Sequence, residues 1–123
     1  MLRTMCALMA VAMLAGCTTP PPPAPGSAAS KVVALGDLKH IEIGPMRVAR
    51  ENGLMTVNVS LNNTSRYTKT MYYRFAWLGD DGFPVAEPEA WKSLMVYGSQ
   101  RSFLPAIAPV AKATDLRLEV KTP

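Results

Sequence analysis

Two pairs of closely spaced carboxylates are the first residues of this sequence that could do acid–base chemistry. Asp80 and Asp81 are adjacent, and Glu87 and Glu89 lie two residues apart. A glycosidase needs two carboxylates that face each other across a bound sugar, about 5 to 9.5 Å apart. Asp80 and Asp81 instead lie between two glycines, a pattern typical of a tight turn that aspartate stabilises. We therefore predict no catalytic residues and expect that the protein is not an enzyme.

Metal and nucleophilic chemistry have few candidate residues. His40 is the single histidine, so it cannot supply the usual metal cluster, and no nucleophile pattern around it suggests a catalytic triad. Methionine sulfur can bind copper, but Met55 and Met71 lie on apolar stripes, where methionine ordinarily fills gaps in a core. We predict no metal site and no cofactor.

Cys17 is the residue with the most specific chemistry. Arg3 precedes an uncharged, mostly apolar run of 13 residues, Thr4 to Gly16. This is typical of a secretory signal peptide and falls short of the roughly 20 residues that a membrane-spanning helix needs. The segment Leu14-Ala15-Gly16-Cys17 resembles the bacterial lipobox, in which the chain is cut before an acylated cysteine. We expect residues 1–16 to be a lipoprotein signal peptide and Cys17 to carry the lipid.

The lipid decides where the protein resides. Each buried CH₂ contributes about 0.8 kcal/mol, so three acyl chains on Cys17 would anchor the protein permanently. By resemblance to bacterial sorting rules, Thr18 in place of an aspartate favours the outer membrane, with the domain facing the periplasm. Cys6 leaves with the signal peptide, so no disulfide or thiol site is expected in the folded body. The alternative is an ordinary cleaved signal peptide that leaves Cys17 as a free thiol.

A proline-rich segment follows the cysteine. Residues 17–30 hold five of the eleven prolines and no charged residue, a composition that cannot form a core. Proline runs favour the polyproline II conformation, which extends about 3.1 Å per residue, so the segment could span roughly 40 Å. We interpret it as a tether; the alternative is that the run of four prolines docks on an aromatic groove of a partner.

The remaining segment, residues 31–123, has the size of one small domain. Without Arg3 the chain carries 12 basic and 9 acidic residues, and the basic residues are dispersed. A nucleic-acid interface would cluster them, so nucleic acid is not the expected partner. Dispersed charge of this kind ordinarily confers solubility.

Alternating apolar residues predict an all-β fold. Residues 54–61 place four apolar side chains on one face, and Asn52-Gly53 before them is a strong signal for a hairpin with residues 46–51. Further strands are expected at residues 71–78, 90–96, 101–104 and 116–121, with a broken or edge strand at 83–85 because Pro84 lacks an amide donor. We predict an antiparallel β-sandwich of six or seven strands, of the immunoglobulin or fibronectin type III kind.

One strand suggests a partner surface. If Tyr73, Phe75 and Trp77 face the core, then Tyr72 and Arg74 face outward beside each other. Tyrosine and arginine dominate the energetics of protein interfaces. We therefore single out a possible binding surface with these members: Tyr72, Arg74, Trp91 and Tyr97. Ordinary packing on the sheet face is the alternative.

The lipobox together with several later segments resembles the YcfL-like family of small proteobacterial lipoproteins. The segments are residues 72–77, Asp80-Asp81-Gly82, Trp91, and residues 104–109 with 115–117. The resemblance implies a periplasm-facing β-sandwich of unknown biochemical function. In some bacteria such proteins are encoded near an outer-membrane lipoprotein that activates a peptidoglycan synthase. The family supplies no catalytic residues.

We expect, from these observations, an outer-membrane lipoprotein whose domain binds another envelope protein without catalysis. The cell-wall synthesis machinery is the candidate partner that the resemblance suggests. The alternative function is a periplasmic module that binds a glycan or a metal ion.

Overall fold

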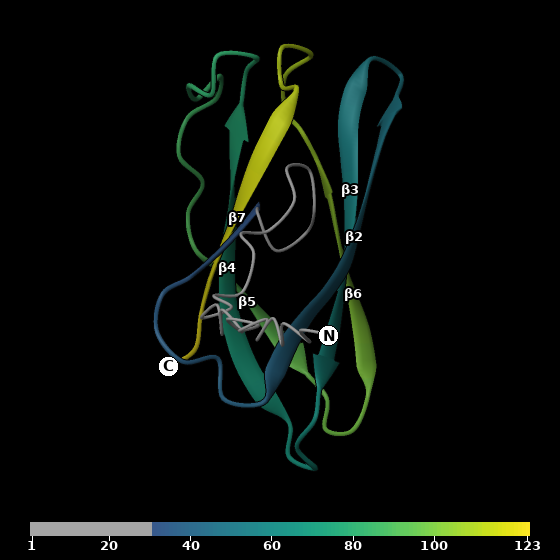
Figure 1. Ribbon diagram of the computed structural model, residues 1–123, viewed down its shortest axis with the longest axis vertical. Helices are drawn as coiled ribbons and strands as arrows, with labels where there is room; N and C mark the ends of the chain where they lie inside the picture. The colour runs from purple at the N-terminus through teal and green to yellow at the C-terminus, as the bar shows by residue number, and fades with distance from the viewer. Residues whose placement is uncertain (1–30) are drawn as a thin grey trace, which may run out of the picture.

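The computed structural model describes residues 31–123, which form seven strands in two sheets (Figure 1). The predicted signal peptide, the expected lipidation site Cys17 and the predicted tether lie outside the described residues. The strands, in chain order, are β1 (Val32–Ala34), β2 (Ile41–Glu51), β3 (Leu54–Asn63), β4 (Lys69–Leu78), β5 (Lys92–Val96), β6 (Arg101–Ile107) and β7 (Asp115–Lys121). Among these residues no helix is long and apolar enough to cross a membrane.

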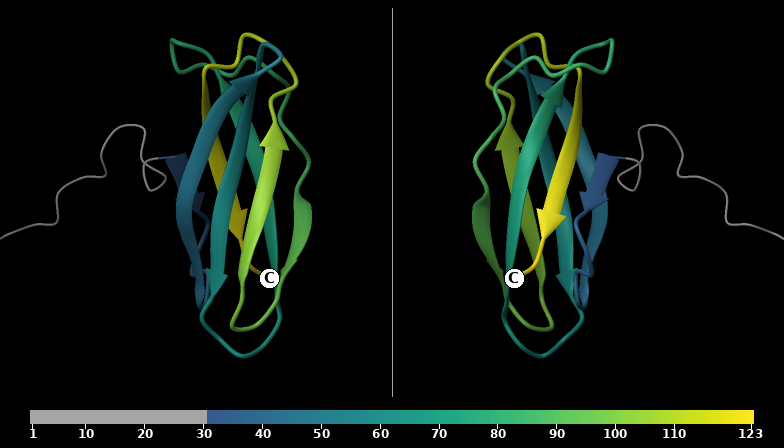
Figure 2. Two further views of the ribbon diagram at one scale, coloured as in Figure 1. Left: turned by 90° about the vertical axis from the view of Figure 1, so that its right-hand side faces the viewer. Right: turned by 90° about the vertical axis from the view of Figure 1, so that its left-hand side faces the viewer.

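The two sheets pack face to face as a sandwich, which confirms the predicted fold class (Figure 2). One sheet has the order β1-β7-β4-β5 and the other β2-β3-β6. All pairings are antiparallel except that of β1 with β7, which is parallel. The sequence did not indicate this parallel pair. Parallel strands need a long connection, and β1 and β7 lie at opposite ends of the domain sequence.

Alternating side chains from both sheets fill the space between them. On β4, Phe75 and Trp77 are each 2% exposed and their rings stack at 5.3 Å, as the predicted inward aromatic row requires. The facing strand β3 buries its four alternating apolar side chains, Met55, Val57, Val59 and Leu61. Burial of these side chains is the main driving force for the fold.

The hairpin between β2 and β3 forms where the sequence predicts it. Asn52 and Gly53 have φ angles of 51° and 78°, so both central residues of the turn are left-handed, as a type I′ turn requires. The ladder of β2 and β3 is broken by a bulge, in which Gly44 and Pro45 together oppose Ser60. This bulge was not predicted.

The segment between β4 and β5 differs from the expected strand at residues 83–85. Only an isolated bridge between Leu78 and Pro84 forms there, because proline cannot donate to a ladder. Glu89 holds the segment to β4 by accepting hydrogen bonds from the Phe75 amide (2.9 Å) and from the Trp77 indole nitrogen (3.2 Å).

Candidate interaction surfaces

Three of the four residues singled out from the sequence lie on the outer face of the four-stranded sheet. Arg74 donates from Nε to Glu119 Oε2 at 2.5 Å, and its guanidinium carbon lies 4.4 Å from the centre of the Trp91 ring. Lys121, which pairs with Tyr72 across β7 and β4, places its ammonium 4.1 Å from the same ring. We call the following five residues the tryptophan cluster: Tyr72, Arg74, Trp91, Glu119 and Lys121.

The guanidinium of Arg74 in the tryptophan cluster is paired within the chain. The carboxylate of Glu119 is only 16% exposed and contacts Arg74 at 2.5 Å and Arg117 at 3.6 Å. Arg74 is hydrogen-bonded to Glu119 and lies over Trp91, so a partner that claimed its guanidinium would first have to break these contacts. Cross-strand pairs of this kind stabilise a sheet.

Tyr97 does not join the tryptophan cluster. It follows the last residue of β5, whereas Trp91 precedes the first, so about 20 Å of extended chain separates them. Tyr97 lies in the loop of residues 97–100, which packs against the loop of residues 64–68. Ser99 donates its amide to the Ser65 carbonyl at 2.7 Å.

The two loops are locked together at the end of the sandwich. A Cβ on Gly98 would lie 2.3 Å from the Arg66 carbonyl oxygen, a distance that no side chain permits. The buried side chain of Asn63 donates to the carbonyls of Tyr67 (2.8 Å) and Val96 (3.0 Å). Tyr67 and Tyr97 are consequently displayed on two loops that are held against each other, and they are 66% and 53% exposed. Sequence reasoning missed Tyr67, because it lies outside the alternating segments.

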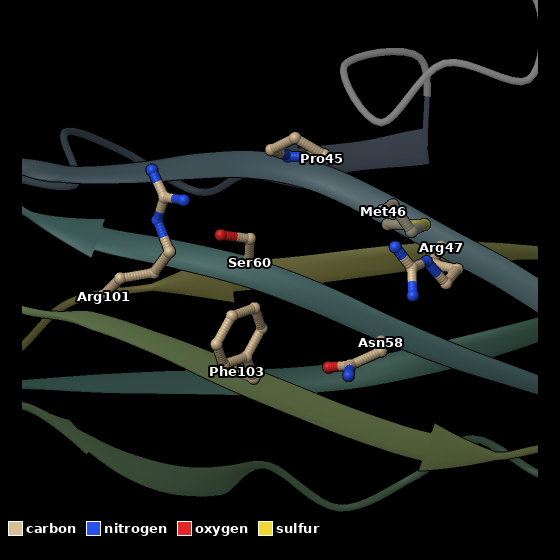
Figure 3. Close-up of a pocket in the computed structure, with 7 residues that line it drawn as sticks. All are labelled: Pro45, Met46, Arg47, Asn58, Ser60, Arg101 and Phe103. Atoms are coloured by element: carbon tan, nitrogen blue, oxygen red, sulfur yellow. The ribbon is translucent and has the colours of Figure 1, made fainter.

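The outer face of the three-stranded sheet carries an open groove of about 500 Å³ (Figure 3). Its lining side chains come from all three strands: Pro45, Met46, Arg47, Asn58, Ser60, Arg101 and Phe103. Figure 3 shows Arg101 and Arg47 at opposite ends, with Ser60, Phe103 and Asn58 between them. The bulge at Gly44 and Pro45 forms the β2 rim of the groove, and bulges often re-aim side chains beside binding sites.

The groove lies beside a row of exposed apolar residues on β6. Phe103 is 60% exposed and Ile107 is 64% exposed, while Leu104 between them faces the core at 2%. Pro105 lies between Phe103 and Ile107 on the same face and is also exposed. Sequence reasoning identified residues 101–104 as a strand but assigned no role to Phe103. Continuous apolar residues from 103 to 107 conceal which face is outward.

The other residues that the sequence suggested for catalysis or metal binding have structural roles or lie outside these surfaces. Asp81 accepts the Phe83 amide at 3.1 Å, the turn-stabilising contact expected for that carboxylate. His40 is exposed, with φ of 73°, in the turn before β2. Within residues 31–123 no three His, Cys, Asp or Glu side chains are grouped as a metal site would require.

The fold and these surfaces define a small two-sheet β-sandwich with several exposed aromatic positions. The chain belongs to the family described as "Protein of unknown function (DUF1425)", whose pattern matches residues 31–122. No curated protein matches the chain significantly.

Two crystal structures share the fold. One is cj0090 of Campylobacter jejuni, with 24% identity and a TM-score of 0.64 over 76% of this chain and 98% of that one. The other is a DUF1425 family member from Shewanella sp. pv-4, with 24% identity and a TM-score of 0.62 over 68% of this chain and 78% of that one.

Proposed function

We propose that this chain is a lipid-anchored, non-catalytic module of the outer membrane that binds another envelope protein through the outer face of β6. The exposure of Phe103 and Ile107, 60% and 64%, carries the proposal. Both lie on one face with Pro105 between them. Adjacent exposed apolar side chains on a small domain mark binding sites, because water solvates such a patch poorly.

The partner docks on the face of the sheet and not by adding a strand to its edge. β6 is an edge strand, paired only with β3 within the three-stranded sheet. Pro105 lies in the middle of β6 and has no amide hydrogen to donate. Proline on an edge strand blocks pairing with a further strand. The side chains that project from the face remain as the binding elements.

The anchoring half of the proposal is supported by the N-terminal sequence. The lipobox ending at Cys17 and the resemblance to YcfL-like lipoproteins both favour a lipid anchor. The tether would enter the domain at Lys31, whose ammonium pairs with Asp115 at the start of β7. The resemblance also makes the cell-wall synthesis machinery the first candidate for the partner.

Photo-crosslinking in living cells tests the proposal. A photoreactive phenylalanine analogue is placed at position 103 or 107 of the full-length chain, and at exposed position 117 on β7 of the opposite sheet as the control. We expect one and the same envelope protein, identified by mass spectrometry, to be crosslinked from 103 and from 107 but not from 117. The absence of any adduct at both test positions, or equal adducts from all three, contradicts the proposal.

A glycan-binding module is the second candidate function, and the groove itself favours it. Asn58 and the two arginines can donate hydrogen bonds to sugar hydroxyls, and the exposed Phe103 ring can stack on a sugar ring. Calorimetric titration of the full-length protein with soluble peptidoglycan fragments tests this candidate. Saturable heat that disappears in Phe103→Ser supports glycan binding, whereas a flat titration with folded protein rejects it.

A further inference from the structure

The lining of the groove is arranged in three cross-strand layers. In the first, Arg47 of β2 lies opposite Asn58 of β3. In the second, Phe103 of β6 lies opposite Ser60, and in the third Arg101 lies opposite Asn62. Asn58, Ser60 and Asn62 alternate along β3, so all three layers open on the same outer face. A guanidinium therefore stands at each end of the groove, with an apolar ring between them.

The two groove arginines differ from the other arginines of the described chain. Arg50 donates to main-chain carbonyls, Arg66 lies over the Tyr67 ring, and Arg74 and Arg117 contact Glu119. Within residues 31–123, Arg47 and Arg101 have no carboxylate within 4.0 Å and donate no side-chain hydrogen bond. The ion pairs of these residues are Lys31–Asp115, Arg74–Glu119, Lys92–Glu89 and Arg117–Glu119. Both are free to bind an anionic ligand.

The spacing of the layers matches an extended peptide. Asn58 and Asn62, which mark the two arginine layers, are four residues apart on β3, about 14 Å. An extended peptide laid along β3 places its residues i and i+4 at the same separation and on one face, with residue i+2 between them. Carboxylates at i and i+4 would meet Arg47 and Arg101. An apolar side chain at i+2 would lie against Phe103.

We propose that the groove binds an extended segment of the partner protein with the pattern acid-x-apolar-x-acid. This inference rests on the proposed function and specifies the chemistry of the partner. Arginine pairs with carboxylates by two parallel, charge-assisted hydrogen bonds, which gives the pairing geometric specificity. The apolar residue at the centre buries the exposed ring of Phe103.

The surroundings of the groove favour a peptide over a glycan. Pro45 lines the β2 rim, and Pro105 and Ile107 continue the apolar row beyond Phe103 on β6. Aliphatic side chains of this kind pack against apolar peptide side chains and offer no hydrogen bonds to sugar hydroxyls. The two guanidinium groups lie at the two ends, where the carboxylates of the peptide lie.

Glu42 limits the affinity of this site. It is exposed on β2 opposite Asn62, in the same layer as Arg101, and its charge opposes a carboxylate of the ligand. Its removal therefore strengthens binding, whereas a purely apolar docking surface would not respond. This opposite response of two residues in one layer is specific to an anionic ligand.

Fluorescence anisotropy on the full-length protein tests the inference with three labelled peptides. Their central sequences are Glu-Ser-Leu-Ser-Glu, the neutral Gln-Ser-Leu-Ser-Gln, and Glu-Glu-Leu-Ser-Ser, which keeps the charge but changes its spacing. We expect saturable binding of the first peptide, weaker by about tenfold or more for the other two. Arg47→Gln and Arg101→Gln should each weaken binding about tenfold, and Glu42→Gln should strengthen it about twofold to threefold.

Matched controls separate the possible outcomes. Arg66→Gln removes a guanidinium outside the groove and should leave binding unchanged, and unaltered melting temperatures show that the variants are folded. The inference is overturned by the absence of saturable binding, by equal binding of the neutral peptide, or by more effective competition from peptidoglycan fragments. It is also overturned if light scattering shows a dimer that Phe103→Ser, a change in the groove, dissociates. If crosslinks from position 103 persist in the double variant Arg47→Gln, Arg101→Gln, the inference fails while the proposed function stands.

Discussion

The side chain of Asn63 at the end of β3 donates a hydrogen bond of 3.0 Å to the carbonyl of Val96 at the end of β5, and so joins the two sheets. Asn63 is fully buried, and its other contacts are equally specific. Its side-chain nitrogen also donates to the Tyr67 carbonyl, and its side-chain oxygen accepts hydrogen bonds from the amide and the hydroxyl of Ser65. One side chain thus closes the end of the sandwich that displays Tyr67 and Tyr97.

Substitution of Asn63 should strongly destabilise the domain. Asn63→Ala removes the side-chain donor to the buried Val96 carbonyl and one of the two side-chain donors to the Tyr67 carbonyl, and a buried group left unpaired costs about 1 to 3 kcal/mol. We expect the melting temperature to fall by about 10 °C or more, since about 1 kcal/mol shifts a domain of this size by roughly 4 to 8 °C. Circular dichroism measures it. Asn58→Ala, on the exposed face, is the control, and equal losses in both variants would disprove the role of Asn63.

The tryptophan cluster should contribute to stability through a measurable pairwise coupling. A cation over an aromatic ring at a partly exposed site is worth about 0.5 to 1 kcal/mol. We expect a double-mutant cycle of Arg74→Ala and Trp91→Ala, followed by urea unfolding, to give a coupling of that size. Additive losses would show that Arg74 and Trp91 do not stabilise each other.

The domain should lose stability in acid through Asp115. Burial alone raises the pKa of the Asp115 carboxyl, but the hydrogen bonds from Lys31 and the Leu116 amide, with the charge of Lys31, outweigh burial and lower that pKa below 3.8. Because the pKa is lower in the folded state, the stabilisation is complete above the unfolded pKa and is lost as pH falls through the folded one.

The dependence of stability on pH in the acid range tests the contribution of Asp115. Urea midpoints measured between about pH 6 and pH 2 should fall less steeply in Lys31→Met than in the unmodified protein, because the lower pKa depends on Lys31. Asp80→Asn, a change in an exposed turn, should leave the slope unchanged. If the urea midpoint of Lys31→Met falls with pH as steeply as that of the unmodified protein, the Lys31–Asp115 pair is not the origin of the acid sensitivity.

The proposed lipid anchor on Cys17 can be tested by measuring the mass of the mature protein. Intact mass spectrometry of chain extracted from membranes should show a protein that begins at Cys17 and carries fatty acids. Cys17→Ser should abolish both the added mass and the membrane fraction. A mature chain without fatty acids would contradict the lipid anchor and leave the ordinary secreted form.

Local sequence signals predicted the elements whose two faces differ. Asn52-Gly53 formed the expected turn, and the alternation around Phe75 placed Tyr72 and Arg74 outward because polar and apolar residues alternate there. The parallel pairing of β1 with β7 joins the two ends of the domain, and no local pattern encodes it.

The groove was beyond sequence reasoning for two physical reasons. Residues 103–107 are apolar on both faces, so alternation cannot decide whether Phe103 or Leu104 faces the core. The bulge at Gly44 and Pro45 shifts the register of β2 and sets the face on which Arg47 lies. The convergence of Arg47 and Arg101 depends on strands that meet only in the folded sheet.

A comparison of crosslinking from position 103 with crosslinking from position 72 is the most direct test of the proposed function. The two positions lie on the outer faces of opposite sheets, and position 72 belongs to the surface that the sequence suggested. We predict that position 103 yields an envelope-protein adduct in cells and position 72 does not. An adduct from position 72 with none from 103 would contradict the account and assign the partner to the tryptophan cluster.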